Sequence, residues 1–257
     1  MTGTAGAVRT LAPARSVTDG AWASVIRTPL LLLGTLVAGV ALTATGQPWQ
    51  AATQLGVLTF TVVNVVCLVL LSRRLRGQGS SIRELLGRWR WSDLAWGLLW
   101  SAVLYVPFAV VLMAVAWPLA GGPEGFGEIF APRNPMTGDG WVIAVAAFAL
   151  VFPFLNAPVE ELFYRGYAQG SFTAAGRPGW ALWIPAAGFA VQHAFIAYTL
   201  TSVLVYLPAF FVWGLLAAAI RRRQGRLTPL IVAHFFTNLA FSAMPLLFLS
   251  GWMGDPA

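Results

Sequence analysis

Residues 141–170 read WVIAVAAFALVFPFLNAPVEELFYRGYAQG, an apolar run that ends in two adjacent glutamates and an arginine. An α-helix needs about 20 apolar residues to cross a bilayer, and this run is long enough. Charged side chains inside such a helix are costly and usually have a function. We therefore expect a membrane-spanning helix in which Glu160, Glu161 and Arg165 are paired or take part in chemistry.

The composition of the chain also indicates a membrane protein. Of its 257 residues, 58% are hydrophobic and 10% are charged, whereas a soluble domain is usually about 25% charged. We count about seven apolar runs of spanning length. They cover roughly residues 28–46, 53–72, 94–119, 141–170, 179–199, 201–220 and 228–250. The predicted fold class is an all-α, polytopic helical bundle with about seven transmembrane helices, whose third helix Pro107 or Pro118 could interrupt.

The distribution of arginine predicts the orientation in the membrane. With seven spans, the arginine-rich segments all fall on one side, so the positive-inside rule places the N-terminus in the cytosol and the C-terminus outside. The basic segment 73–93 is expected to form a short amphipathic helix on the inner surface. We interpret the net charge of +7 as membrane orientation and lipid contact, not as nucleic-acid binding. The composition hints at a bacterial plasma membrane.

Four regions are expected along the chain. Residues 1–27 form a flexible cytosolic tail, 28–139 the first transmembrane helices, 140–250 a second transmembrane region, and 251–257 a C-terminal tail. The single cysteine, Cys67, excludes an intrachain disulfide and a thiolate metal site.

The second transmembrane region contains both histidines of the chain, His193 and His234. Glu161 and Arg165 are four residues apart, so they can form an ion pair on one helix face. Glu160 points about 100° away from Glu161 and can face a different partner.

The spacing also brings the candidate residues to one depth. The turn signal at 176–179 places Glu160 and His193 roughly 24 Å from the same turn, at 1.5 Å per residue. His234 and Asn238 share a helix face, in the cytosolic half of the membrane. We therefore expect a site that opens toward the cytosol.

These residue types are sufficient for amide hydrolysis without a nucleophilic serine or cysteine. A carboxylate and a histidine can activate water, and a His–Asn pair can donate hydrogen bonds to the oxyanion. Glu160, His193 and His234 could instead bind zinc, since two histidines and a glutamate are a common catalytic set. The sequence leaves metal-free and metal-bound water open, although it has no His-Glu-x-x-His segment.

Three motifs resemble those of the CAAX-processing and bacteriocin-processing (CPBP, or Abi) intramembrane proteases. Glu160–Gly166 (EELFYRG) is similar to the family's E-E-x-x-x-R, Phe189–His193 (FAVQH) to F-x-x-x-H, and His234–Asn238 (HFFTN) to H-x-x-x-N. The motifs occur in the family's order, each on a predicted span. The resemblance covers about residues 140–250.

The resemblance implies a hydrolase that cleaves a membrane-associated peptide or protein. Glu160 would activate water with His193, and His234 and Asn238 would form the oxyanion hole. Glu161 and Arg165 would be a supporting pair. The family is commonly called a metalloprotease family, but we favour a metal-independent glutamate mechanism.

Two other functions remain open from the sequence. Intramembrane Glu and His also build the proton relays of transporters, although the chain lacks an internal repeat of the kind that many transporters show. A non-catalytic membrane scaffold or immunity factor could also keep these residues.

Overall fold

The computed structural model describes residues 15–132, 136 and 139–249 of the chain. The predicted C-terminal tail and residues 1–14 lie outside this part. In chain order, the helical elements are α1 (Val17–Val25), α2 (Arg27–Ala44), η1 (Trp49–Leu55), α3 (Gly56–Gly77), α4 (Ile82–Leu86), α5 (Ser92–Ala120), α6 (Pro123–Phe130), α7 (Asp139–Glu161), η2 (Leu162–Ala168), α8 (Gln169–Ala174), α9 (Trp180–Gln192), η3 (His193–Ile196), α10 (Leu200–Gln224) and α11 (Thr228–Leu249).

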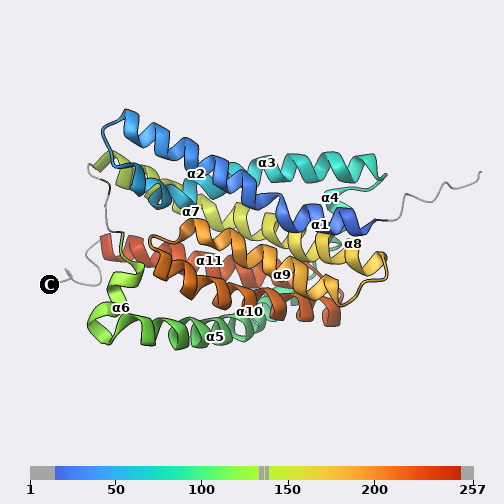
Figure 1. Ribbon diagram of the computed structural model, residues 1–257. Helices are drawn as coiled ribbons and strands as arrows, with labels where there is room; N and C mark the ends of the chain where they lie inside the picture. The colour runs from blue at the N-terminus through green and yellow to red at the C-terminus, as the bar shows by residue number, and fades with distance from the viewer. Residues whose placement is uncertain (1–14, 133–135, 137–138, 250–257) are drawn as a thin grey trace, which may run out of the picture.

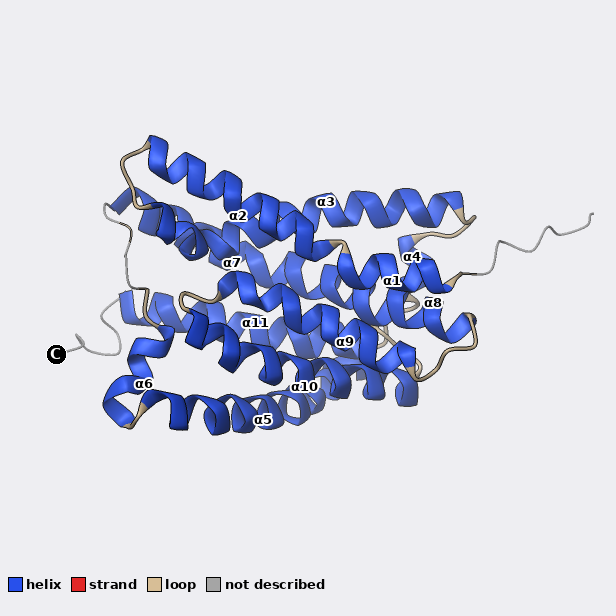
Figure 2. Ribbon diagram, in the orientation of Figure 1, coloured by secondary structure: helices blue, strands red, loops and turns tan. Residues whose placement is uncertain are grey.

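The long helices form a bundle along one common direction (Figure 1), and no strand occurs among the described residues (Figure 2). The prediction of an all-α helical membrane protein is confirmed. Among these residues, five helical stretches are long and apolar enough to cross a membrane: Val17–Ala44, Trp49–Gly77, Ser92–Ala120, Val145–Ala174 and Leu200–Gln224. The fifth predicted span is the shorter apolar stretch Trp180–Ile196, and the last corresponds to α11. The total of seven stays a prediction.

The N-terminal region differs from the expected flexible tail. Ser16 begins α1 with a capping box, in which its side chain accepts from the Asp19 backbone and the Asp19 side chain accepts in return. Such a reciprocal cap satisfies two backbone donors that a helix start leaves free. Trp22 then packs against Phe163 of η2, with ring centroids 5.7 Å apart. Residues 17–27 are therefore part of the bundle.

Helix α5 is continuous although it contains Pro107 and Pro118. A proline removes one backbone hydrogen bond, and transmembrane helices tolerate this loss where neighbouring groups compensate. The predicted third span is therefore not interrupted.

The basic segment 73–93 is divided among three elements. Its first residues extend α3 to Gly77, the five-residue α4 follows, and Ser92 begins α5. No residue of α4 is buried. The amphipathic helix that the sequence predicts is therefore short and covers only part of the segment.

The hydrophobic core is shared by the two predicted transmembrane regions. Phe60 and Leu104 from the first region belong to the same buried cluster as Phe163 and Trp213 from the second. The boundary at residue 140 is therefore a boundary of sequence and not of packing.

Candidate active site

The two adjacent glutamates lie where α7 changes into the π-helix η2. All seven residues of η2 are buried. Single π-helical turns interrupt α-helices most often at functional sites, because they re-aim the side chains around them. The E-E-x-x-x-R segment therefore lies in the interior of the bundle.

Glu161 forms the ion pair that its spacing predicts. Arg165 Nη1 donates to Glu161 Oε1 over 3.0 Å, and both side chains are 1% exposed. The same oxygen lies 2.9 Å from Nδ1 of His234. Since Arg165 favours the carboxylate form of Glu161, Nδ1 of His234 carries the proton and donates to it. The other ring nitrogen of a neutral His234, Nε2, is then an acceptor.

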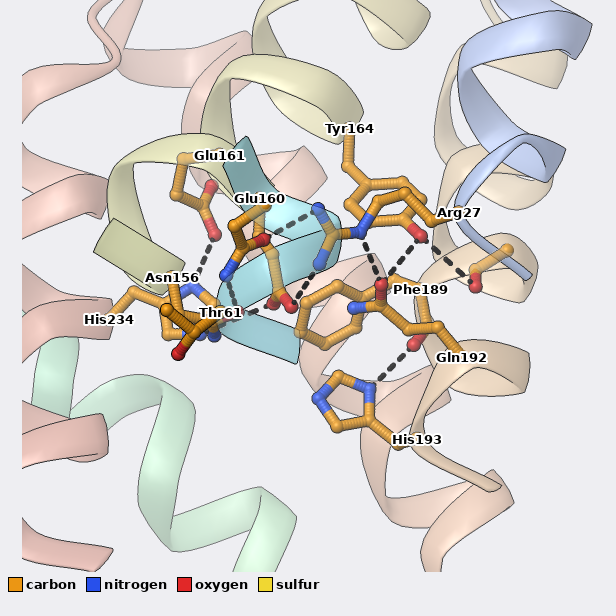
Figure 3. A network of polar contacts seen from close by, with 12 residues as sticks. Arg27, Thr61, Asn156, Glu160, Glu161, Tyr164, Phe189, Gln192, His193 and His234 are labelled. Atoms are coloured by element: carbon orange, nitrogen blue, oxygen red, sulfur yellow. Dashed lines mark hydrogen bonds and ion pairs between the residues drawn. The ribbon is translucent and has the colours of Figure 1, made fainter. Parts of the chain in front are cut away.

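Glu160 pairs with Arg27, the last residue of the expected flexible tail. Arg27 Nη2 donates to Glu160 Oε1 over 3.0 Å, and both side chains are completely buried (Figure 3). The other oxygen, Oε2, has no hydrogen-bond partner among the described residues. It lies 3.6 Å from Nε2 of His234. His234 therefore stands between the two carboxylates, as a spacing argument alone could not show.

Arg27 connects this pair to a wider polar network (Figure 3). Its Nε donates to Gln192 Oε1 over 2.6 Å, and its Nη1 donates to Asn64 Oδ1 over 2.8 Å. Asn64 in turn donates to Asn156 Oδ1 over 2.9 Å. Sequence reasoning missed Arg27, Gln192, Asn64 and Asn156. A single arginine before an apolar run resembles a membrane anchor, and neutral amides in a span attract little attention.

His193 follows Gln192 and lies beside the same network. Its Nδ1 is 2.6 Å from the carbonyl oxygen of Phe189, one turn earlier. A carbonyl only accepts, so Nδ1 carries the proton and Nε2 is an acceptor. The ring stacks on Phe210 with centroids 3.5 Å apart and an interplanar angle of 10°. The hydrogen bond to Phe189 and the stacking on Phe210 together fix the orientation of the imidazole.

A cavity of about 890 Å³ adjoins the two histidines. Its polar lining includes His193, His234, Asn238, Thr237 and Asn156. The Nδ2 group of Asn238 is buried without a hydrogen-bond partner among the described residues. Glu160 does not line the cavity itself; it contacts His234, which does. The remaining wall is largely apolar and aromatic, contributed among others by Phe60, Phe108, Phe126, Phe130, Phe152 and Phe241.

The structure therefore joins four of the six predicted residues by direct contacts. Glu160, Glu161, Arg165 and His234 form one chain of contacts, and Asn238 lies on the His234 helix beside the cavity. His193 lines the same cavity as His234, and its neighbour Gln192 contacts Arg27. No contact joins His193 directly to Glu160 among the interactions of the described residues.

The alternative zinc set fits this arrangement poorly. In the part of the chain that the structure describes, no three His, Cys, Asp or Glu side chains converge as a metal-binding group. One oxygen of Glu160 is held by Arg27, a cation beside the position that a zinc ion would need.

A family model matches the segment of the chain that carries the three motifs. Residues 141–240 match the family described as Rce1-like, type II CAAX prenyl endopeptidase Rce1-like. The match supports assignment of the chain to the CAAX protease family, and the resemblance that the three motifs predicted is confirmed. No curated protein and no solved structure matches the chain.

Proposed function

We propose that the protein is an intramembrane endopeptidase that hydrolyses a peptide bond of a membrane-associated peptide or protein. The observation that carries the proposal is the contact chain Arg27–Glu160–His234–Glu161, a set of ionisable groups buried inside a membrane bundle and beside a cavity. Buried charges of this kind are expensive in a membrane and usually mark function. The CAAX protease family match gives the same class of reaction.

Glu160 is the proposed base. Its Oε2 has no hydrogen-bond partner among the described residues, so it is available to accept a proton from a water molecule that enters from the cavity. His193 orients this water through Nε2, since its Nδ1 is engaged by the Phe189 carbonyl. The hydroxide oxygen attacks the scissile carbonyl as the proton leaves.

His234 is proposed to move that proton. Its Nδ1–H is held by Glu161, so Nε2 can accept the proton from Glu160, and the imidazolium lies between two carboxylates. The Nε2–H and the free Nδ2–H of Asn238 then donate to the oxyanion. When the C–N bond breaks, His234 returns the proton to the leaving amine, and Glu160 and His234 regain their starting states.

The cavity supports a substrate with an apolar part. Its aromatic wall extends from the histidines to Phe126 and Phe130 of α6, which suits a substrate segment that is already in the membrane. We also propose that the reaction proceeds without a metal, in a bacterial plasma membrane with the N-terminus cytosolic and the C-terminus outside. In this orientation η1 and α6 lie on the outer side, so a cavity that reaches them does not support the predicted opening toward the cytosol.

The test uses the purified full-length chain in lipid nanodiscs with a panel of membrane-proximal peptides. We expect the wild type to release defined products and Glu160→Gln and Glu160→Ala to release none. Glu84→Gln is the control, because Glu84 lies in the exposed α4 capping box. Equal product release by the wild type and both Glu160 variants overturns the proposal, and Glu160-dependent ion flux in liposomes without peptide release replaces it with transport.

The metal-free proposal has its own test. We expect metal-depleted protein to keep full activity in the presence of a chelator. Loss of activity that zinc restores would overturn that part of the proposal and leave peptide hydrolysis intact.

A further inference from the structure

Arg27 lies outside the segment that matches the family, yet it is bonded to the proposed base. It is the first residue of α2, and its side chain is completely buried. A guanidinium has five N–H donors in a fixed plane. Here its three nitrogens reach three different helices, to Glu160 on α7, Gln192 on α9 and Asn64 on α3.

The residues that Arg27 contacts are themselves held by further hydrogen bonds. Tyr164, one turn after Glu160, donates its hydroxyl to the same Gln192 Oε1 over 3.0 Å. Asn64 holds Asn156, one turn before Glu160. The guanidinium plane is therefore fixed by groups on both sides of Glu160, and it cannot rotate without breaking several hydrogen bonds.

The two oxygens of Glu160 become different as a result. Arg27 occupies Oε1, whereas Oε2 stays without a hydrogen-bond partner among the described residues and is directed to His234. A base in general acid–base catalysis must lie within hydrogen-bond reach of the proton that it removes. The orientation that Arg27 imposes leaves Oε2 without a partner on the side of His234, which lines the cavity.

We propose that Arg27 is a positioning residue for Glu160, so that α2 completes the active site that residues 141–240 carry. The inference rests on the proposed hydrolytic function. It implies that Arg27 acts on the rate of the chemical step more than on substrate binding, because it touches Glu160 and not the cavity wall.

A purely structural role for Arg27 makes a different prediction. Replacing a buried ion pair with apolar residues is often neutral for stability, so stability alone does not account for a buried arginine. The chain offers a matched comparison in Arg74, whose Nη2 lies 2.6 Å from Asp19 Oδ1. This pair also ties the N-terminal helix α1 to the bundle, but it touches neither glutamate of the site.

The experiment compares Arg27→Gln, Arg27→Lys and Arg74→Gln in full-length protein in nanodiscs, with kcat and KM measured per folded molecule. For Arg27→Gln we expect kcat to fall by about 100-fold with little change in KM, as for a small misplacement of a catalytic group. Arg27→Lys should recover part of kcat, since it keeps a cation beside Oε1. Arg74→Gln should lower the unfolding temperature but keep kcat near the wild-type value. Equal fractional losses of kcat in Arg27→Gln and Arg74→Gln, or a loss confined to KM, overturn the inference.

A second readout does not depend on peptide hydrolysis. Dicyclohexylcarbodiimide reacts with membrane-buried carboxyl groups, and mass spectrometry locates the adduct. We expect Glu160 to be modified faster in Arg27→Gln than in the wild type, and at the wild-type rate in Arg74→Gln. If the wild type cleaves no peptide but this pattern holds, the hydrolytic proposal fails, while the inference that Arg27 positions Glu160 stands. An unchanged rate of Glu160 modification in Arg27→Gln overturns that inference.

Discussion

The Nδ1 atom of His234 lies 2.9 Å from the Oε1 atom of Glu161. This contact assigns the tautomer of the histidine and gives the second glutamate of the motif a defined task. It also places the free Nε2 atom of His234 on the side of Glu160. The two adjacent glutamates thus act on one imidazole from its two nitrogen atoms.

Glu161→Gln should therefore damage both the fold and the site. It leaves Arg165 as an unpaired buried cation, and breaking a buried ion pair in this way costs about 3–5 kcal/mol. It also removes the carboxylate that holds the Nδ1–H tautomer of His234. Thermal unfolding in nanodiscs measures the first effect, with Glu84→Gln as the exposed control. A Glu161→Gln protein as stable as the control would show that the Arg165 pair does not support the fold.

Glu160 and Arg27 should behave as a coupled pair. Each single change, Glu160→Met or Arg27→Met, leaves one buried charge without its partner and should cost about 3–5 kcal/mol. The double variant removes both charges with little change in volume and should be close to the wild type in stability. A double-mutant cycle of unfolding free energies measures the coupling. Additive losses would contradict the buried ion pair, and any activity in the double variant would contradict the role of Glu160.

Asn238 should affect turnover with little effect on stability. Its Nδ2 is an unpartnered donor among the described residues beside the cavity, so Asn238→Leu removes a proposed oxyanion donor without breaking a hydrogen bond. We expect kcat to fall by about 100-fold to 1,000-fold. Thr237→Val is the matched control on the same helix, since the hydrogen bond of the Thr237 hydroxyl goes to the Ala233 carbonyl of its own helix. Equal kcat in both variants would remove Asn238 from the mechanism.

The packing of α1 on α9 gives a prediction about the fold alone. A Cβ atom added at Gly188 would overlap the backbone carbonyl of Ser24, whereas one added at Gly179 would meet open space. Gly188→Ala should cost about 1–3 kcal/mol, as overpacking does, and Gly179→Ala should be neutral. Unfolding temperatures of the two variants measure the difference. Equal stability would show that α1 does not pack on α9 as closely as described.

The sequence predicted the local geometry of this site well, but it did not predict its long-range partners. The Glu161–Arg165 pair follows from a spacing of four residues on one helix, and the separate direction of Glu160 follows from the helical period. The pairing of Glu160 with Arg27 joins residues 133 positions apart. No periodicity carries that information, and Arg27 precedes an apolar run as an orientation residue would.

The N-terminal region shows the same limit in the fold. Composition favoured a flexible tail over 1–27, since this stretch is polar and rich in small residues. The capping box of Ser16 and Asp19 was readable in the sequence, but the burial of α1 against η2 depends on a surface that only the folded bundle creates. The span that carries Glu160, Glu161 and Arg165, in contrast, was predicted correctly as long and apolar enough to cross a membrane, because its apolar run is long and its charges are few.

The most direct test of the account is peptide cleavage in water enriched in ¹⁸O. The wild type in nanodiscs should release a product whose new carboxyl group carries ¹⁸O, because a water molecule activated by Glu160 attacks the peptide bond. Folded Glu160→Gln should release none above the uncatalysed level. Equal ¹⁸O-labelled product from both proteins would contradict the role of Glu160, and no cleavage by the folded wild type across the peptide panel would contradict hydrolysis itself.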